Sequence, residues 1–223
     1  MGNVAEAAQK DQDSRCAGGV VSRPCHAHPA TTTHAIGSGG GGWVDNKNSV
    51  TLMALQTLIS EDRIQARIAE IGAQIDIDYP EGTLYLICIL KGACFFLADL
   101  ARAVKRDAFI EFMGISSYGK GKTSSGEVKI TKDLDISLEG AHVLIVEDII
   151  DSGVTLNYLT SLLNTRKPKS VRVATLLDKP ERRLRHVDVA YVGFRIPDEF
   201  VVGYGLDYAE KYRNLRDVCV LEP

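Results

Sequence analysis

The sequence predicts an α/β fold built on a largely parallel, twisted sheet that is flanked by helices. Short apolar segments such as LYLICIL at 84–90 have the composition of strands buried on both faces. They alternate with longer segments, such as 60–75, in which apolar residues recur at helical spacing. This alternation is typical of β-α-β units, whose ligands bind beyond the carboxyl ends of the strands.

The expected elements follow in order along the chain. We expect helices over 60–75, 93–106 and 155–167, and strands over 84–90, 109–115, 128–134, 142–149, 170–178 and 187–196. Ser60 is placed to cap the first helix, and acidic residues follow it in the first turn. The second helix ends in basic residues, and Pro168 stops the third.

Residues 1–52 differ in composition from the rest of the chain. They are rich in Gly, Ala, Ser, Thr and His, and GSGGGG at 37–42 is typical of a flexible linker. We therefore expect a disordered N-terminal extension over 1–52 and a folded domain over 53–223. A zinc site at Cys16, Cys25 and the histidines of CHAHP is the alternative, but eight residues separate the two cysteines, which is not a usual ligand spacing.

The overall composition of the chain argues against some classes of partner and location. The chain has 223 residues, 45% hydrophobic, and a net charge of −3, so it offers no broad basic field for nucleic acid or an anionic membrane. No apolar run approaches the length of a membrane span. The cysteine count is odd, and Cys88 and Cys219 lie within apolar runs, which favours buried, reduced thiols. We therefore expect a cytoplasmic protein that binds neither nucleic acid nor membranes.

The stretch VLIVEDIIDSGVTL at 143–156 combines acids with a turn suited to an anion. Glu147, Asp148 and Asp151 stand at the carboxyl end of an apolar strand, and DSGVT then leads into a helix. Helix N-terminal amides bind anions, and Gly153 lets a ligand approach the backbone closely. A sugar phosphate would use both features, whereas an ordinary acidic surface turn would need neither. The acidic phosphoacceptor pocket of signalling receiver domains does not explain why DSGVT leads into a helix.

VLIVEDIIDSGVTL resembles the phosphoribosyl-pyrophosphate motif of the type I phosphoribosyltransferases, and most closely the hypoxanthine-guanine members. The resemblance covers roughly 58–221 and includes ILKGA (89–93), SSYG (116–119), LLDKPERR (176–183) and VGFRIPDEFVVGYGLDYAEKYRNL (192–215). It implies a type I phosphoribosyltransferase domain over 53–223, with a small hood and a flexible lid loop at 116–127. The implied reaction transfers phosphoribosyl from phosphoribosyl pyrophosphate (PRPP) to hypoxanthine, and to guanine, with release of pyrophosphate. It also implies a homodimer or homotetramer.

The resemblance also implies roles for individual residues. Asp151 is the catalytic acid/base near N7 of the purine. The ribose and 5′-phosphate are bound by Glu147, Asp148, Asp151, Ser152, Gly153, Val154 and Thr155, and pyrophosphate by Lys91, Gly92 and Arg213, with a cis peptide between Leu90 and Lys91. Ser117 and Tyr118 form the lid, the purine is contacted by Lys179, Phe200, Val201 and Asp207, and Mg²⁺ is held by Glu147, Asp148 and Asp207. Val154 stands where a relative has lysine, and its side chain is expected to point away from the ligand.

Without the resemblance, several of these residues have ordinary interpretations. Lys179, Asp207 and Arg213 would be solvated surface residues, and Phe200 would be a core residue. Two functional alternatives also stay open. One is an RNA-binding regulator with the same fold, for which the sequence offers the locally basic runs 166–172 and 179–185. The other is the same reaction with xanthine as the main base.

Overall fold

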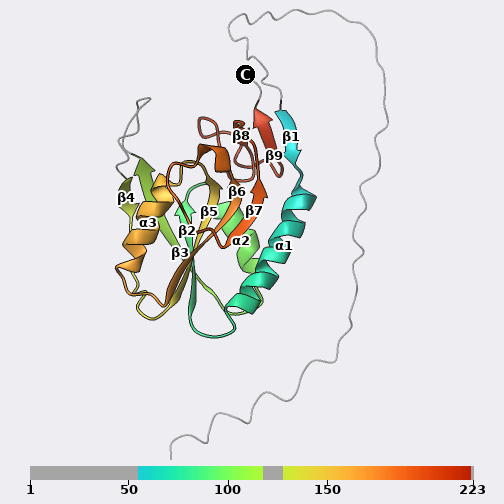
Figure 1. Ribbon diagram of the computed structural model, residues 1–223. Coiled ribbons are helices and arrows are strands. Elements are labelled where there is room, and N and C mark those ends of the chain that lie inside the picture. The colour runs from blue at the N-terminus through green and yellow to red at the C-terminus, as the bar shows by residue number, and fades with distance from the viewer. Residues whose placement is uncertain (1–54, 118–127, 222–223) are drawn as a thin grey trace, which may run out of the picture. The chain divides into compact units, whose positions relative to one another are not determined.

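The computed structural model describes residues 55–117 and 128–221 (Figure 1). The predicted extension over 1–52 and most of the predicted lid, including Tyr118, lie outside these residues. The helices are α1 (Glu61–Asp78), α2 (Cys94–Ala103), α3 (Val154–Asn164) and the short 3-10 helix η1 (Pro180–Arg182). Within the described ranges, no helix is both long enough and apolar enough to span a bilayer.

The main sheet has six strands in the order β4-β3-β2-β5-β6-β7. Their bounds are β2 (Leu84–Leu90), β3 (Phe109–Ser117), β4 (Val128–Lys132), β5 (His142–Ile150), β6 (Ser170–Asp178) and β7 (Tyr191–Arg195). Neighbouring strands pair in parallel, except that the edge strand β4 runs antiparallel to β3. The predicted α/β fold with a largely parallel sheet is confirmed.

A second, antiparallel sheet joins the two ends of the described chain. Strands β1 (Leu55–Ile59), β9 (Val218–Leu221) and β8 (Val201–Val202) pair in the order β1-β9-β8. Figure 1 shows this small sheet beyond the carboxyl ends of the main sheet's strands. It occupies the place of the small hood that the family resemblance implied.

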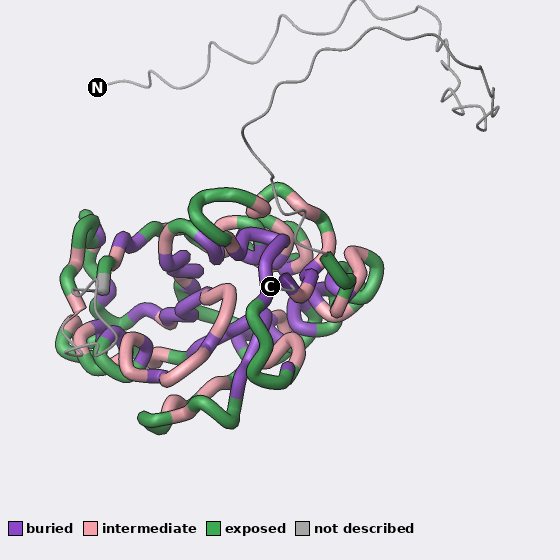
Figure 2. The backbone as a smooth tube through the Cα atoms, turned by 90° about the horizontal axis from the view of Figure 1, so that it is seen from above, coloured by how far each residue is buried: buried purple, intermediate pink, exposed green. Residues whose placement is uncertain are grey.

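Both faces of the main sheet are buried, as the apolar strand compositions predict. In β2, Leu86 and Cys88 belong to the core formed with α1 and α2, whereas Ile87 and Ile89 belong to the core formed with α3. Strand side chains alternate between faces, so a strand covered on both sides must be apolar throughout. Figure 2 shows this buried backbone at the centre of the described domain.

Several local expectations need correction. Helix α2 ends at Ala103 rather than at 106, and strand β4 ends at Lys132 rather than at 134. Helix α3 ends at Asn164 rather than at 167, because the chain leaves the helix through a turn in which Lys167 has a φ of 55° before Pro168. Strand β7 begins at Tyr191 rather than at 187, where pairing with β6 starts. Ser60 occupies the N-cap position of α1 without a side-chain cap bond.

Candidate active site

A cavity of about 350 Å³ opens at the carboxyl ends of β2 and β5. Ten of the predicted site residues line it: Lys91, Gly92, Glu147, Asp148, Asp151, Ser152, Gly153, Thr155, Asp207 and Arg213. They come from three separate parts of the chain, namely the β2–α2 turn, the end of β5 with the start of α3, and the segment before β9. Parallel strands bring their carboxyl ends to one edge of the sheet, which is why these segments meet there.

The segment from β5 to α3 forms the side of this cavity that the sequence predicts to bind an anion. Gly153 is the N-cap of α3 and has a φ of 78°, a left-handed conformation that favours glycine. A Cβ atom at this position would lie 2.5 Å from the carbonyl oxygen of Arg185, so there is no room for a side chain here. Gly153, Thr155 and Leu156 line the cavity, so the N-terminus of α3, where backbone amides lack partners within the helix, lies beside it.

Two carboxylates at the end of β5 carry unfavourable charge when no ligand is present. Burial raises the pKa of Glu147 well above its ordinary value, and repulsion from Asp148 raises it further. Burial also raises the pKa of Asp148 to about 6, although the Asp148 carboxylate accepts a hydrogen bond of 2.7 Å from the backbone N–H of Ile149. A cation, or ligand hydroxyls that donate hydrogen bonds, would stabilise this pair in its ionised form.

The β2–α2 turn is shaped by its contact with these acids. The peptide bond between Leu90 and Lys91 is cis, as the family resemblance implied. A Cβ atom on Gly92 would lie 1.6 Å from an Asp148 carboxylate oxygen, so only glycine fits beside that carboxylate. The turn therefore depends on Gly92 to keep its backbone against the floor of the cavity.

Lys91 and Arg213, the cations predicted to bind pyrophosphate, form ion pairs with acidic residues of the segment before β9. The Arg213 guanidinium lies 2.7 Å from an Asp207 carboxylate oxygen and 3.6 Å from Glu210. The Lys91 ammonium lies 3.2 Å from the same Glu210 carboxylate. Glu210 therefore occupies, between two cations, the kind of position that an anionic ligand would take.

The donor set of the cavity fits a magnesium ion. Among the described residues, no three His, Cys, Asp or Glu side chains form a ready-made metal cage. Magnesium commonly binds through one or two carboxylates together with substrate phosphates and water. Glu147 and Asp148 supply such carboxylates, and the raised pKa of each indicates that its ionised form is destabilised, a penalty that a bound cation would reduce. Asp207 is the weaker candidate, because its carboxylate is already paired with Arg213.

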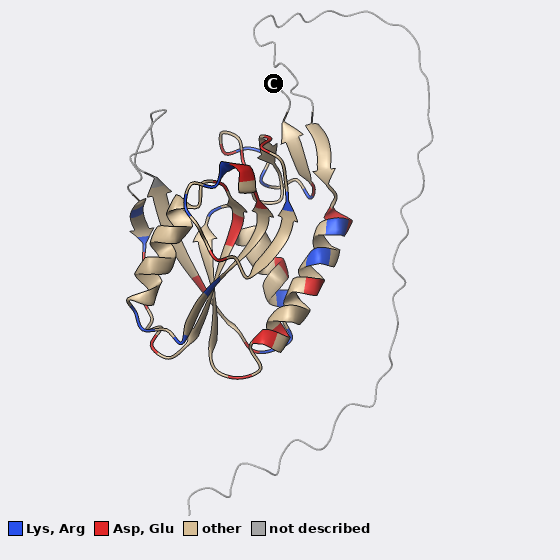
Figure 3. Cartoon of the chain, viewed as in Figure 1, with Lys and Arg blue, Asp and Glu red and all other residues tan. Residues whose placement is uncertain are grey.

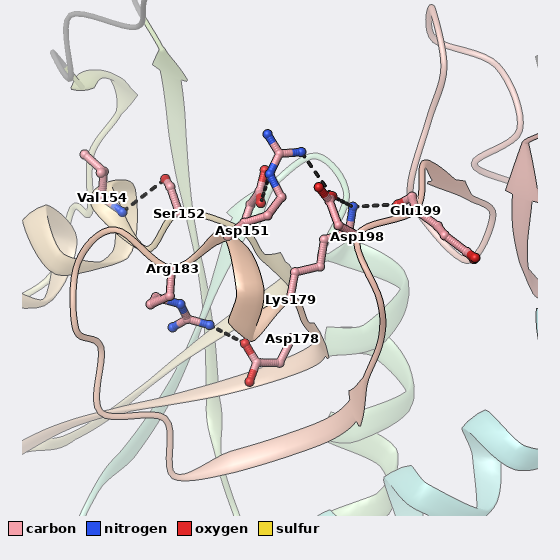
Figure 4. A network of polar contacts seen from close by, with 9 residues as sticks. Asp151, Ser152, Val154, Asp178, Lys179, Arg183, Asp198 and Glu199 are labelled. Atoms are coloured by element: carbon pink, nitrogen blue, oxygen red, sulfur yellow. Dashed lines mark hydrogen bonds and ion pairs between the residues drawn. The ribbon is translucent and has the colours of Figure 1, made fainter.

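A network of polar contacts adjoins the cavity on the side of β6 (Figure 4). Lys179 is only 6% exposed, and its ammonium donates a hydrogen bond of 2.6 Å to the carbonyl of Glu199. The interpretation of Lys179 as a solvated surface lysine is therefore wrong. Phe200 is 53% exposed and packs edge-on against Tyr208, so the interpretation as a core residue is wrong too.

Comparison with known proteins identifies the family of the chain. Residues 58–209 match the phosphoribosyl transferase domain family. The chain belongs to this phosphoribosyltransferase family. It is 53% identical over 172 residues to the hypoxanthine-guanine phosphoribosyltransferase of Mycobacterium avium, a match that covers 74% of this chain and 85% of the relative. The corresponding protein of Bacillus subtilis is 52% identical over 168 residues, which cover 75% of this chain and 93% of the relative.

A solved structure supports the same assignment. The hypoxanthine phosphoribosyltransferase of Staphylococcus aureus superimposes with a TM-score of 0.73 at 48% identity, covering 75% of this chain and 91% of that chain. The fold is therefore the type I phosphoribosyltransferase fold, and the chain is an enzyme, a purine-salvage phosphoribosyltransferase. The predicted family and reaction class are confirmed.

The individual roles of the site residues stay predictions in this phosphoribosyltransferase. Val154 does not line the cavity with the other cradle residues, in keeping with the expectation that its side chain points away. Val201 is buried in β8 opposite Val220 of β9, and Phe200 directly precedes it. Ser117 is the last residue of β3, and its side chain, like Tyr118, lies outside the described residues.

Three residues at the rim of the site were not predicted from the sequence, namely Arg182, Asp198 and Glu210. Arg182 forms an ion pair of 2.9 Å with Asp151, and Asp198 lies between Arg182 and Lys179. Pro180 follows Lys179 and begins η1, so a tight turn at this point was predictable. The sequence did not predict that this turn points toward Asp151, because that direction depends on how β5 and β6 pair.

Proposed function

We propose that this phosphoribosyltransferase transfers the phosphoribosyl group of PRPP to hypoxanthine and guanine, forming inosine and guanosine monophosphate and releasing pyrophosphate. The observation that carries the proposal is one cavity in which the carboxylates of Glu147 and Asp148 adjoin the amides at the start of α3. The carboxylates suit the ribose hydroxyls, and the amides suit the 5′-phosphate. The relatives named above carry hypoxanthine and guanine in their names.

In the proposed reaction, a purine ring nitrogen forms a bond to C1 of the ribose as the bond from C1 to pyrophosphate breaks. Asp151 accepts the proton that leaves the purine near N7. Glu147 and Asp148 bind the ribose hydroxyls, and their negative charge favours the cationic sugar that develops at C1. Ser152, Gly153, Val154 and Thr155 hold the 5′-phosphate, chiefly through backbone amides.

The purine is held by the side of the site that adjoins β6 and β8. The Lys179 ammonium donates to the exocyclic O6 of a 6-oxopurine, whereas the amino group of adenine cannot accept this bond. Phe200 supplies an exposed aromatic ring on which the purine stacks. Val201 contributes backbone groups to the edge of the ring, and Asp207 lies near the base and a metal ion.

The leaving pyrophosphate is bound by Lys91, Gly92 and Arg213, which line the same cavity. Ser117 and Tyr118, in the loop after β3, close over it and exclude water. Mg²⁺, held by Glu147, Asp148 and Asp207, supplies charge neutralisation for the phosphates when bound. The raised pKa values of Glu147 and Asp148 support this metal assignment, because a cation would remove their electrostatic penalty.

We further propose a homodimer or homotetramer in the cytoplasm. Ile110 and Phe112 are exposed on β3, which supports an interface between copies of the chain. The free thiols of Cys88, Cys94 and Cys219 support a reducing compartment. A role in RNA binding is not favoured, since the basic run at 179–185 is largely neutralised within the domain, as three of its cations pair with acids.

A base-panel assay tests the proposed function. The full chain, PRPP and Mg²⁺ are incubated with hypoxanthine, guanine, xanthine and adenine in turn, and nucleotide formation is followed by absorbance and chromatography. We expect inosine and guanosine monophosphate, and no adenosine monophosphate. Xanthosine monophosphate as the main product would replace the base assignment, and no nucleotide from any base would overturn the proposal.

Lys179→Ala tests the origin of base selectivity. We expect kcat/KM for hypoxanthine to fall by about 10- to 100-fold, because a buried donor to O6 is lost. The matched control is Lys169→Ala, an exposed lysine that does not line the cavity. An unchanged preference for 6-oxopurines over adenine in the Lys179 variant would show that O6 is recognised by another group.

A further inference from the structure

The turn at η1 is tied closely to the loop that carries Asp151. The backbone N–H of Lys179 donates to the carbonyl of Ile150 at 2.9 Å. Past the turn, the N–H groups of Leu184 and Arg185 both donate to the carbonyl of Ser152, at 2.9 and 3.0 Å. The segment is therefore anchored on both sides of η1 to the loop at 150–152, which gives the intervening side chains a defined position.

Arg182, the last residue of η1, connects two carboxylates at the purine side of the site, those of Asp151 and Asp198, which Figure 4 labels. Its Nε atom lies 2.9 Å from Oδ1 of Asp151, and its Nη1 atom lies 3.3 Å from Oδ1 of Asp198. The same Asp198 oxygen lies 3.6 Å from the ammonium of Lys179. Arg182 thus joins the proposed proton acceptor to the loop that leads to Phe200.

The neighbouring Arg183 provides a useful contrast. Its guanidinium pairs with Asp178, and both side chains are largely buried, at 20% and 10% exposure. The side chains of Arg182, Asp151 and Asp198 are instead 50%, 45% and 47% exposed. Ion pairs this exposed contribute little to stability, because water screens them. Arg183 has the burial of a structural residue, whereas Arg182 has the position of one that orients other groups.

The contact from Arg182 leaves acceptor positions on the Asp151 carboxylate open. Oδ1 of Asp151 is shielded from solvent and has no hydrogen-bond partner of good geometry among the described residues, although the Arg182 guanidinium is close. Asp151 lines the cavity, and almost half of its side chain is exposed. A neighbouring guanidinium of this kind restricts the carboxylate to one orientation without occupying all of its acceptor positions.

We propose that Arg182 is a positioning residue for the purine half of the reaction. It orients the Asp151 carboxylate toward the purine proton and, through Asp198, holds the loop at 197–200 that presents Phe200 to the base. This inference rests on the proposed function, because it assigns Arg182 a role through Asp151. Arg182 touches neither PRPP nor the reacting atoms in this assignment, so its loss affects the steps that involve the base and spares donor binding.

The test compares three arginine variants in the full chain. Arg182→Met removes the charge and keeps much of the length, Arg182→Lys restores the charge, and Arg166→Met removes an arginine that pairs with Asp133 away from the cavity. For Arg182→Met we expect kcat/KM for hypoxanthine to fall by about 10- to 100-fold, since small misplacements of catalytic groups have effects of this size. The dissociation constant for PRPP with Mg²⁺, measured by calorimetry without base, should change by less than about twofold.

The two controls separate positioning from structural support. Arg182→Lys should recover part of the activity, and Arg166→Met should match the unsubstituted enzyme in kcat, in both KM values and in PRPP affinity. Full activity of Arg182→Met would overturn the proposal. Equal losses in hypoxanthine turnover and PRPP binding, or a fall in melting temperature that accounts for the lost activity, would overturn it as well.

A double-variant experiment tests the connection through Asp198. If Arg182 acts partly through this carboxylate, Asp198→Asn in the Arg182→Met background should add less loss of kcat/KM than Asp198→Asn alone. Fully additive losses would remove Asp198 from the proposal. If the unsubstituted enzyme forms no nucleotide, the proposed function is overturned, and the role of Arg182 with it. If the enzyme is active and Arg182→Met does not change its activity, only the inference about Arg182 is overturned.

Discussion

The two halves of the site are built in different ways. The proposed sugar-phosphate half is almost contiguous, since Glu147 to Thr155 run from the end of β5 into α3 and offer backbone amides as well as side chains. The purine half is assembled from side chains of separate segments, with Lys179 after β6, Arg182 in η1 and Phe200 before β8. A contiguous half can be recognised as a motif, whereas a dispersed half depends on how the strands pair.

The two halves also differ in charge. Figure 3 shows acidic segments where β5 ends, in the centre of the domain, with basic segments around them. In the sugar half, Glu147 and Asp148 carry charge that burial makes unfavourable. Asp151, where the two halves meet, and Asp198, on the purine side, are both paired with Arg182. The carboxylates of the sugar half would therefore be stabilised by a bound cation or by ligand hydroxyls. The carboxylates on the purine side already have a cationic partner without any ligand.

Asp151→Asn should have the largest effect and would test the boundary between the halves. We expect kcat to fall by about 10²- to 10⁴-fold, because the purine proton loses its acceptor. PRPP binding, measured by calorimetry, should stay within a few-fold if Asp151 serves mainly the purine. The control is Asp135→Asn, an exposed acid that does not line the cavity. Unchanged turnover would remove Asp151 from the chemistry.

A change of pH should have the next largest effect, through donor binding. It tests whether the two halves of the site differ in charge as described. The pKa of Asp148 is raised from 3.8 to about 6, so between these values the folded protein holds a proton that the unfolded chain has lost. The contribution of Asp148 to stability is therefore present at low pH and is lost as pH rises through about 6.

Binding of Mg²⁺ and PRPP should show the opposite trend, because it requires the ionised carboxylate. We expect affinity to rise by about tenfold per unit below pH 5, by about fivefold between pH 5 and 6, and to level off above that range. Calorimetry across pH 5 to 7 measures this dependence, and the same series with Asp148→Asn corrects for ionisation of PRPP itself. An identical pH dependence in that variant would mean that Asp148 does not control donor binding.

Gly153→Ala should have a smaller effect, on the sugar half alone. Gly140 provides the matched control, since both glycines have positive φ, 78° and 72°, but a Cβ on Gly140 meets no atom within 4 Å. Gly140→Ala should cost only the left-handed strain, about 1–2 kcal/mol in the free energy of unfolding. Gly153→Ala should cost more and raise KM for PRPP by about tenfold, because its Cβ collides with the Arg185 carbonyl near the phosphate cradle. Urea denaturation and initial rates measure both quantities, and equal costs at the two positions would contradict the clash.

Glu210→Gln should have the smallest effect and should act on pyrophosphate binding. Glu210 pairs with Lys91 at 3.2 Å and lies 3.6 Å from Arg213, which stays paired with Asp207, so its neutralisation should free Lys91 for the donor. The pairs are exposed, so we expect KM for PRPP to fall by only about two- to fivefold. Glu70→Gln, which breaks an exposed pair with Arg67, is the control. A rise in KM for PRPP would show that Glu210 assists binding rather than competing with it.

The small sheet shows where sequence patterns reach their limit. Strands β2, β5 and β6 were predictable because burial on both faces demands long apolar runs. Strand β8 has only two residues, and β1 finds its partner β9 at the opposite end of the described chain. No local periodicity encodes such a pairing. The cap of α1 is similar, because Asp217 rather than Ser60 accepts the N–H of Glu61, at 2.7 Å.

By itself, the sequence determined the parallel sheet, the glycine turn at the start of α3 and the acids beside it, because each depends on residues that are neighbours along the chain. Only the tertiary structure decided that Lys179 is buried, that Phe200 is exposed and that Arg182 reaches Asp151. These outcomes depend on the pairing of β5 with β6 and on the backbone bonds that join the segments following them. Burial and ion pairing between distant segments are properties of packing, which residue type and spacing do not specify.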